Sequence, residues 1–245
     1  MLFRSRGRES QARVKPQPTT LEPHANRTLP TSVIIWGPEY DEATQIIGSW
    51  LDEIPVPKGM SKHSAIGKDI NKDDFNQILD ETEGTNRIKI FGGHGSPDAL
   101  LGPVYENCAR TVIDGNEFAV LYDETSIRDG SAALFAFCCK AGGKLGIRFA
   151  ESGERTFLGY DGNIGYDLDN EECQKVWGTI IQIVSREIIK DGEIAKKHED
   201  LLRKLYDEAL EYFRDGQGKE NDRALETVIL LMQHKKFLRR IGGSS

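Results

Sequence analysis

Two mostly apolar runs of strand length dominate the hydrophobic pattern of the chain, and each ends at a residue with reactive chemistry. Residues 88–93 lead to His94, and residues 132–138 lead to Cys139. A strand buried on both faces of a parallel sheet has this continuous apolar pattern, and such sheets carry their functional groups at the carboxyl ends of the strands. If the two strands are neighbours, an imidazole and a thiol meet at one edge of the sheet.

Amphipathic stripes with a helical period stand between these runs and the N-terminus. Asp41, a residue type typical of a helix N-cap, precedes an i, i+3, i+4, i+7 stripe over residues 43–54. After a polar connection, Asp73 or Asp74 is expected to cap a shorter stripe over residues 75–79. Because an apolar run precedes the first stripe, the order is strand, helix, helix, strand. This crossover pattern predicts a parallel sheet.

The segment between the two reactive runs is punctuated by Gly, Pro and Asn, which predicts a loop excursion with a hairpin over residues 97–118. Residues 118–122 fit either a strand or the start of a helix. Residues 155–160 predict one more strand, and from Asn170 the apolar spacing is helical to the end, in three stripes. We expect these helices to pack on the sheet; a helical appendage that binds a partner is the alternative.

Composition narrows the class of protein. The 245 residues suffice for one sizeable α/β domain, and 38% hydrophobic against 29% charged residues is typical of globular proteins. The net charge of −7 argues against nucleic-acid binding. No apolar run approaches the roughly 20 residues that a membrane span needs. Four cysteines without a secretory signal predict free thiols in a reducing cytoplasm.

Residues 1–30 differ from the rest of the chain. They hold four of the nine prolines, and six Lys or Arg residues against two Glu give them a net charge of +4. No apolar periodicity is present. This composition predicts a disordered basic tail. An organelle transit peptide is the alternative, which the prolines disfavour.

The candidate chemistry lies in the histidine and the cysteine pair. Cysteine attacks as a thiolate, and a nearby histidine can generate that thiolate and later protonate a leaving amine. His94 and Cys139 stand 45 positions apart, and they need to meet only in space. Strand alternation places Cys138 and Cys139 on opposite faces, so only one of them can meet His94. The plainer alternatives are a turn histidine satisfied by the backbone and inert buried thiols.

Two blocks in this order, one ending in His94-Gly95 and the next in Cys138-Cys139, resemble those of the caspase-like cysteine peptidases. That superfamily includes caspases, legumains, gingipains, separases and the bacterial CHAT domains. The run Cys139-Lys140-Ala141-Gly142 is most similar to the CHAT pattern, as is the strand that follows it. In caspases the histidine also precedes the cysteine, by about 50 residues.

The resemblance implies a fold and a domain division. It implies an α/β catalytic core over residues 31–170, built as a caspase-like three-layer sandwich with a mostly parallel central sheet. Residues 171–245 would add a C-terminal helical segment, packed on the core or appended to it, for which the resemblance does not account.

The resemblance also implies roles for single residues. A small residue precedes the nucleophile in the family, so Cys138 takes the small position and Cys139 the reactive one. His94 is the catalytic histidine. The backbone N–H groups of Gly95 and Cys139 would form the oxyanion hole, with Gly95 allowing close approach of a substrate.

Substrate preference is inferred from acidic residues after the last predicted strand. Relatives that cleave after Arg or Lys carry an acid there, and Asp167, followed by Asp161, is the candidate in this chain. A carboxylate in a substrate pocket favours basic residues by charge pairing; a solvated loop acid is the alternative. Specificity for Asp would instead need arginines such as Arg148 and Arg155 to converge.

The expected function is therefore that of a cytoplasmic thiol protease, a hydrolase that acts on a protein or peptide substrate without a cofactor. Regulation by a protein partner or by processing is also expected from the resemblance. The alternative is a catalytically inactive scaffold or binding module on the same fold. A zinc site at the cysteine pair is disfavoured because adjacent strand residues face opposite ways, and a nucleotide site at residues 142–144 lacks the required spacing.

Overall fold

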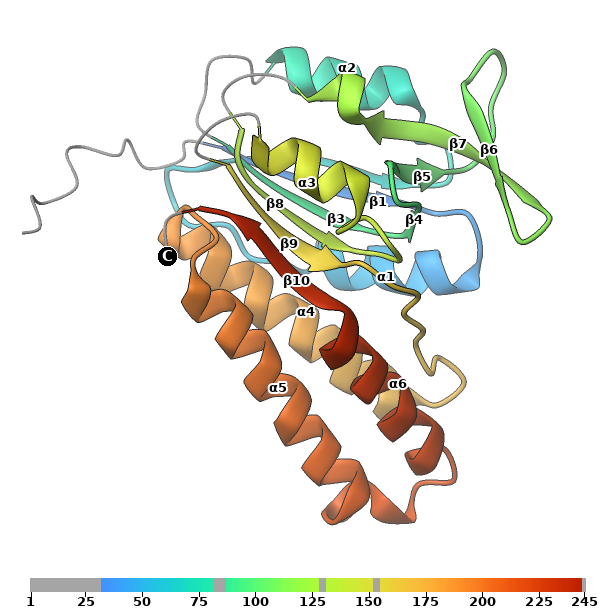
Figure 1. Ribbon diagram of the computed structural model, residues 1–245, viewed down its shortest axis with the longest axis vertical. Coiled ribbons are helices and arrows are strands. Elements are labelled where there is room, and N and C mark those ends of the chain that lie inside the picture. Colours follow the sequence, from blue (N-terminus) through green and yellow to red (C-terminus); the bar gives the residue numbers. More distant parts are fainter. Residues whose placement is uncertain (1–31, 82–86, 128–130, 152–154, 244–245) are drawn as a thin grey trace, which may run out of the picture.

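The computed structural model describes residues 32–81, 87–127, 131–151 and 155–243 (Figure 1). The tail predicted over residues 1–30 lies outside the described residues. The chain is an α/β protein with a six-stranded, mostly parallel sheet, a small antiparallel sheet and helices that include the C-terminal ones.

The six-stranded sheet has the order β10-β9-β8-β3-β1-β2, and every neighbouring pair is parallel except β10 with β9. Its strands are β1 (Ser32–Pro38), β2 (Ser61–Gly67), β3 (Arg87–Gly92), β8 (Ser131–Phe137), β9 (Thr156–Tyr160) and β10 (Leu238–Gly242). The predicted neighbourhood is confirmed: β3, which leads to His94, pairs directly with β8, which leads to the cysteines.

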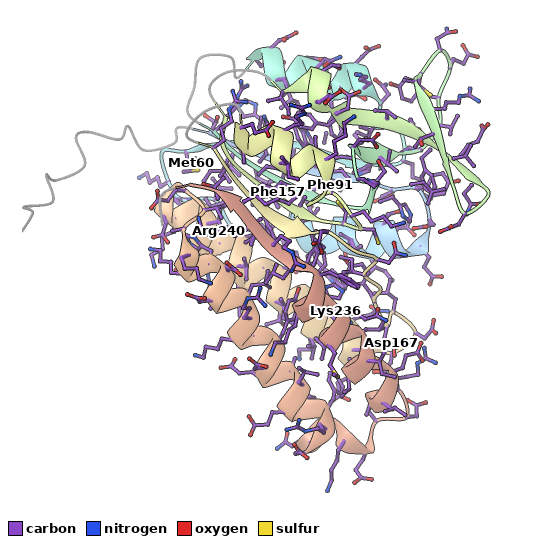
Figure 2. The ribbon with its side chains drawn as sticks, viewed as in Figure 1. Met60, Phe91, Phe157, Asp167, Lys236 and Arg240 are labelled. Carbon is purple, nitrogen blue, oxygen red and sulfur yellow. The ribbon has the colours of Figure 1, made fainter. Side chains whose placement is uncertain are left out.

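Helices cover both faces of this sheet and bury two apolar clusters (Figure 1). One face carries α1 (Glu42–Asp52) and α4 (Glu171–Asp191), and the other carries α2 (Lys72–Glu81) and α3 (Lys144–Glu151). Phe91 and Phe157, labelled in Figure 2, belong to the second cluster, and the Phe157 ring packs against Gly146 of α3. We refer to the two sides as the α1/α4 face and the α2/α3 face.

The C-terminal segment shares the core of the sheet. Helices α5 (Lys196–Arg214) and α6 (Ala224–Phe237) follow α4, with a 3₁₀ turn at Gln217–Glu220 between them. A single cluster of buried residues includes Phe135 of β8, Trp177 of α4 and Leu231 of α6. One continuous apolar core therefore contains residues from both sides of the boundary expected near residue 170.

The prediction that the chain is helical to its end is wrong. After α6 the chain turns into β10, which runs antiparallel to β9 at the edge of the sheet. Leu238 is buried in the cluster of the α1/α4 face, whereas Ile241 packs toward the other face. The strand was missed because Arg239 and Arg240 give it the charged composition that edge strands often have.

Two details near the N-terminus also differ from expectation. The polar connection contains β2, an edge strand paired only with β1, so most of its side chains are exposed or half-buried and it lacks an apolar signature. Helix α2 is capped by Asn71, whose side chain accepts from the N–H groups of Asp73 and Asp74 at 2.8 and 3.2 Å. Neither aspartate is the cap.

The excursion between β3 and β8 forms the second sheet. It contains β4 (His94–Gly95), β5 (Ala99–Gly102), β6 (Arg110–Ile113) and β7 (Asn116–Asp123), in the order β4-β5-β7-β6, followed by a 3₁₀ turn at Glu124–Ser126. All pairs are antiparallel, so the predicted hairpin is confirmed and residues 118–122 are part of a strand.

Candidate active site

The two adjacent cysteines lie on opposite faces of the sheet, as strand alternation predicts. Cys138 is 1% exposed and belongs to the apolar cluster of the α2/α3 face. Cys139 is half-buried and packs against the cluster of the α1/α4 face. Only Cys139 can therefore serve a site on the α1/α4 face.

His94 stands beside the cysteines because β3 and β8 are in register. Gly92 is paired with Phe137, and the N–H of Gly93 donates to the Phe137 carbonyl at 3.4 Å. One residue beyond His94, the segments that follow β3 and β8 are in close contact: a Cβ built on Gly95 would lie 2.5 Å from the Cys139 carbonyl oxygen. The strand ends thus bring the histidine and the cysteine to one corner of the sheet.

The imidazole of His94 lies at the start of α1. Its Nε2 is 2.8 Å from Oδ2 of Asp41, the residue that caps α1. The ring is bordered by Tyr40 and Phe118, with centroid distances of 5.7 and 4.9 Å. Asp41 immediately precedes α1, and α1 packs on the same apolar cluster as Cys139.

The thiol of Cys139 is engaged by a different residue in this conformation. Its Sγ donates to the Ile164 carbonyl at 3.2 Å and accepts from the Ile164 N–H at 3.3 Å. Burial raises the pKa of this thiol, partly offset by the Ile164 N–H and Lys140. Among the described residues, no hydrogen bond joins the thiol to His94. The group is a protonated thiol at neutral pH.

The loop that carries Ile164 follows β9 and is held by the C-terminal segment. The N–H of Asp161 donates to the Phe237 carbonyl at 3.0 Å, and Nε2 of His234 lies 3.0 Å from the Gly165 carbonyl. These contacts join the loop to α6 on either side of Ile164. The position of the thiol thus depends on helices that follow it by more than sixty positions in the chain.

The expected oxyanion donor Gly95 has a backbone suited to the role. The Ser96 N–H donates to the Ala99 carbonyl at 2.9 Å, and hydrogen-bonded and non-hydrogen-bonded pairs alternate along an antiparallel ladder. The next pair, Gly95 with Leu100, is therefore a non-hydrogen-bonded one. Its N–H points away from β5 and is not used by that ladder, as an oxyanion donor requires.

We expect Gly95→Ala to damage the site severely. The new methyl group would meet the Cys139 carbonyl oxygen at 2.5 Å and Cys138 Sγ at 2.6 Å, so the strand ends must separate. The expected loss is about 1–3 kcal/mol of unfolding free energy, as for other overpacked sites. Alkylation of Cys139, followed by mass spectrometry, should also slow.

A matched control for that variant is Gly48→Ala in α1. A Cβ on Gly48 would come no closer than 3.3 Å, to the Ile66 side chain, and alanine favours the helix. Equal stability and equal alkylation rates for the two variants would show that the close approach at Gly95 is not required.

Both of the acids expected to bind a basic substrate are paired with arginines in this structure. Asp167 is 1% exposed, and its Oδ2 accepts from Nε of Arg223 at 3.0 Å and from the Thr227 hydroxyl at 3.3 Å (Figure 2). Asp161 pairs with Arg239 at 2.7 Å. Both carboxylates thus join the loop to α6 and β10. A preference for basic residues stays a prediction of the sequence that this geometry does not support.

The arginines considered for an acidic substrate do not converge on the thiol. Arg148 pairs with Glu151 of α3 at 3.1 Å, and the guanidinium of Arg155 lies 5.7 Å from the Phe149 ring. Phe149 belongs to the cluster of the α2/α3 face. These arginines therefore lie on the side of the sheet opposite to Cys139.

Sequence reasoning missed two groups of the site, Asp41 and the backbone of Ile164. Asp41 was assigned only the N-cap of α1, a role that it also has, because it accepts from the Thr44 N–H at 2.9 Å. Its second partner, His94, is 53 positions away, and no local pattern could reveal it. Ile164 acts through its backbone, which leaves no signature in the sequence.

Within the described ranges, no three His, Cys, Asp or Glu side chains gather in a way that could hold a metal ion. None of the helices in those ranges is long and apolar enough to cross a membrane. No protein-family model and no curated protein matches the chain.

Proposed function

We propose that the protein is a caspase-like cysteine endopeptidase in which Cys139 is the nucleophile and His94 the general acid and base. One observation carries this proposal. Two adjacent parallel strands lead to an imidazole and a thiol at one edge of the sheet; the imidazole is bound to the carboxylate that caps α1, and the thiol packs on the apolar cluster that α1 covers. Structural cysteines are usually buried and inert, whereas Cys139 is half-buried and follows the strand that pairs with the one leading to His94.

The proposed reaction begins when Nδ1 of His94 accepts the proton of the Cys139 thiol. The thiolate attacks the scissile carbonyl carbon, and the backbone N–H groups of Gly95 and Cys139 stabilise the oxyanion. His94 then gives its proton to the leaving amine, which departs and leaves an acyl-enzyme. Water, deprotonated by His94, hydrolyses that thioester and restores the thiol.

In this proposal, the conformation in which Cys139 is bonded to Ile164 is a resting one. For the reaction to begin, Sγ must leave the Ile164 backbone and turn toward His94. The C-terminal helices hold the loop that carries Ile164, so a protein partner or a processing event that acts on them would change access to the thiol. We include such regulation in the proposal.

The experiment that tests the proposal is alkylation of the intact protein with iodoacetamide across pH, read by mass spectrometry at each cysteine. Cys108 is a half-buried thiol that packs against the cluster of the α2/α3 face and donates to the Tyr105 carbonyl at 3.0 Å, and it serves as an internal reference. We expect Cys139 to react faster than Cys108 near neutral pH, because molecules in which Sγ leaves Ile164 and meets His94 form the thiolate, and we expect this advantage to disappear in His94→Ala. Hydrolysis of a mixed fluorogenic peptide library by the wild type completes the test.

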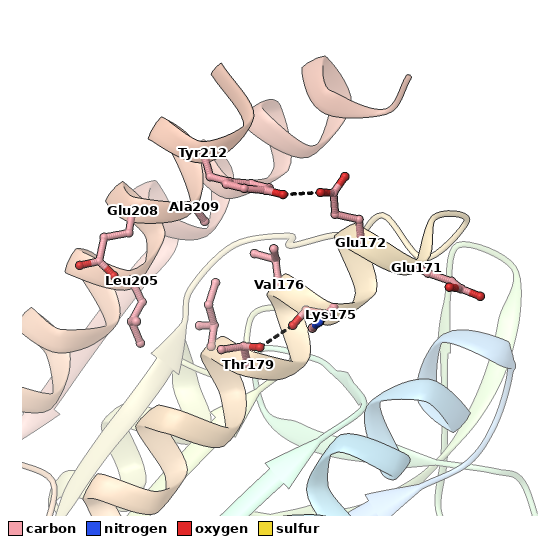
Figure 3. A pocket seen from close by; sticks show the side chains of 10 residues that line it. Glu171, Glu172, Lys175, Val176, Thr179, Leu205, Glu208, Ala209 and Tyr212 are labelled. Carbon is pink, nitrogen blue, oxygen red and sulfur yellow. Dashed lines mark hydrogen bonds between the residues drawn. The ribbon is translucent and has the colours of Figure 1, made fainter. Parts of the chain in front are cut away.

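A second candidate function is a binding module without catalysis, and a groove between α4 and α5 favours it (Figure 3). The groove has a volume of about 610 Å³ and an apolar floor that includes Val176, Ile180 and Leu205. The acids on its rim outnumber the single lysine: they are Glu171, Glu172 and Glu208. A basic peptide with apolar side chains fits this chemistry. Alkylation of Cys139 no faster than that of Cys108, with no peptide hydrolysis, would favour this function.

A further inference from the structure

The two carboxylate oxygens of Asp41 have different partners. Oδ1 accepts from the Thr44 N–H at 2.9 Å, which caps α1, and Oδ2 lies 2.8 Å from Nε2 of His94. The Asp41 N–H donates in turn to the Thr44 hydroxyl at 2.9 Å, which completes a capping box. The start of the helix thus fixes the carboxylate that the imidazole contacts.

This contact determines which nitrogen of His94 carries its proton. An ionised carboxylate only accepts hydrogen bonds, so Nε2 of the neutral ring must be the donor and Nδ1 is left as an acceptor. The rings of Tyr40 and Phe118 lie beside the imidazole and restrict its rotation. The neutral ring therefore has the tautomer that can take a proton from a thiol at Nδ1.

We propose that Asp41 is a positioning residue that holds His94 in its reactive tautomer and orientation, and that the site works as Asp41, His94 and Cys139 together. This inference rests on the proposed function. The proton moves only from Sγ to Nδ1 of His94; Asp41 stays ionised throughout and balances the charge of the imidazolium. No atom of Asp41 touches a reacting atom.

The electrostatics of Asp41 agree with this role. Burial raises its pKa, but hydrogen bonds from Thr44 and from His94 outweigh burial and hold the pKa below its usual value. The carboxylate is consequently ionised at neutral pH. Its negative charge lies 2.8 Å from Nε2 of the ring that takes up the proton in the proposed reaction.

Three substitutions separate the two roles of Asp41. Asp41→Asn keeps a residue that caps helices well but removes the charge, and its amide can donate to Nε2, which would force the wrong tautomer. Asp41→Ser keeps the cap and is too short to reach the imidazole. Thr44→Val is the matched control, because it removes only the hydroxyl of the capping box and keeps the backbone N–H of residue 44 that holds Oδ1 of Asp41.

The test measures Cys139 alkylation by iodoacetamide at pH 7 and, where peptides are cleaved, kcat and KM. We expect Asp41→Asn and Asp41→Ser to slow alkylation about tenfold and to lower kcat about a hundredfold or more, with KM within about twofold. Thr44→Val should stay within about twofold of the wild type. A double variant that combines His94→Ala with either Asp41 substitution should have the same alkylation rate as His94→Ala alone.

An Asp41→Asn effect that persists at full size in the His94→Ala background would overturn the proposal, because Asp41 would then act without His94. So would an alkylation rate within twofold of the wild type, or a wild type that reacts no faster than His94→Ala. If alkylation responds as expected but no peptide is cleaved, the assignment of Asp41 stands and the peptidase proposal fails.

Discussion

Cys139→Ala is expected to lower the rate of peptide hydrolysis by more than about a thousandfold, whereas Cys138→Ala should stay within a few-fold of the wild type. Loss of the nucleophile removes the acyl-enzyme route and leaves only binding and oxyanion stabilisation. Cys138 carries its thiol on the opposite face, in the apolar cluster with α2 and α3. Its replacement removes one buried sulfur, which costs about 1 kcal/mol or somewhat more.

The measurement is initial-rate hydrolysis of a fluorogenic peptide by both variants and the wild type, with unfolding in urea to show that each variant is folded. The two cysteines are adjacent, and both are at least half-buried, so they form a closely matched pair. Equal rates for Cys139→Ala and the wild type would end the peptidase assignment. Full loss in Cys138→Ala alone would exchange the roles of the two thiols.

The part of the site that was predictable from the sequence is the part that buried strands encode. Continuous apolar runs identified the strands β3 and β8, and alternation correctly separated Cys138 from Cys139. The edge strands β2 and β10 were missed because solvent beside them allows polar and charged residues. The hydrophobic pattern of a sequence reflects burial, so strands that are only partly buried are not recognised from it.

Contacts between distant segments could not be predicted from the sequence for another reason. Asp41 meets His94, and Asp167 meets Arg223, only because helices cross the sheet at particular places. A sequence shows that a carboxylate is present but not which cation or imidazole the fold brings to it. For Asp167 this difference changes the interpretation, because a residue expected to bind substrate instead joins the loop near Cys139 to α6.

The contact between α6 and the loop that carries Ile164 should be most sensitive to pH at His234. It is fully buried among aromatic rings, with Nδ1 3.1 Å from the Tyr206 hydroxyl and Nε2 3.0 Å from the Gly165 carbonyl. Burial lowers its pKa to about 3, and the hydrogen bond to Gly165 acts in the opposite direction without offsetting it. The native protein therefore holds this ring neutral.

The sign of the effect follows from the two states. In the unfolded chain a histidine has a pKa of about 6.5, so between that pH and about 3 the unfolded state binds a proton that the native state does not. The contribution of His234 to stability is complete above about pH 6.5 and is lost as the pH falls. The loss is about 1.4 kcal/mol for each pH unit, or about 2 kcal/mol between pH 6.5 and 5.

We expect His234→Gln to remove this slope. At pH 7.5 the variant should be less stable than the wild type by about 2–4 kcal/mol, since the glutamine cannot replace the ring and both of its hydrogen bonds. Between pH 6.5 and 5 its unfolding free energy should fall less than that of the wild type, by about 2 kcal/mol, as measured by urea unfolding.

Tyr206→Phe is the control for the titration itself. It removes the hydroxyl that bonds to Nδ1 but leaves the buried ring, so it should lower stability at every pH and keep the slope of the wild type. Parallel pH profiles for the wild type and His234→Gln would contradict the assignment of this slope to His234. A steeper fall in the unfolding free energy of the glutamine variant would contradict it as well. Carboxylates that titrate in the same pH range are common to all three proteins, so their contribution to the slope cancels in the comparison.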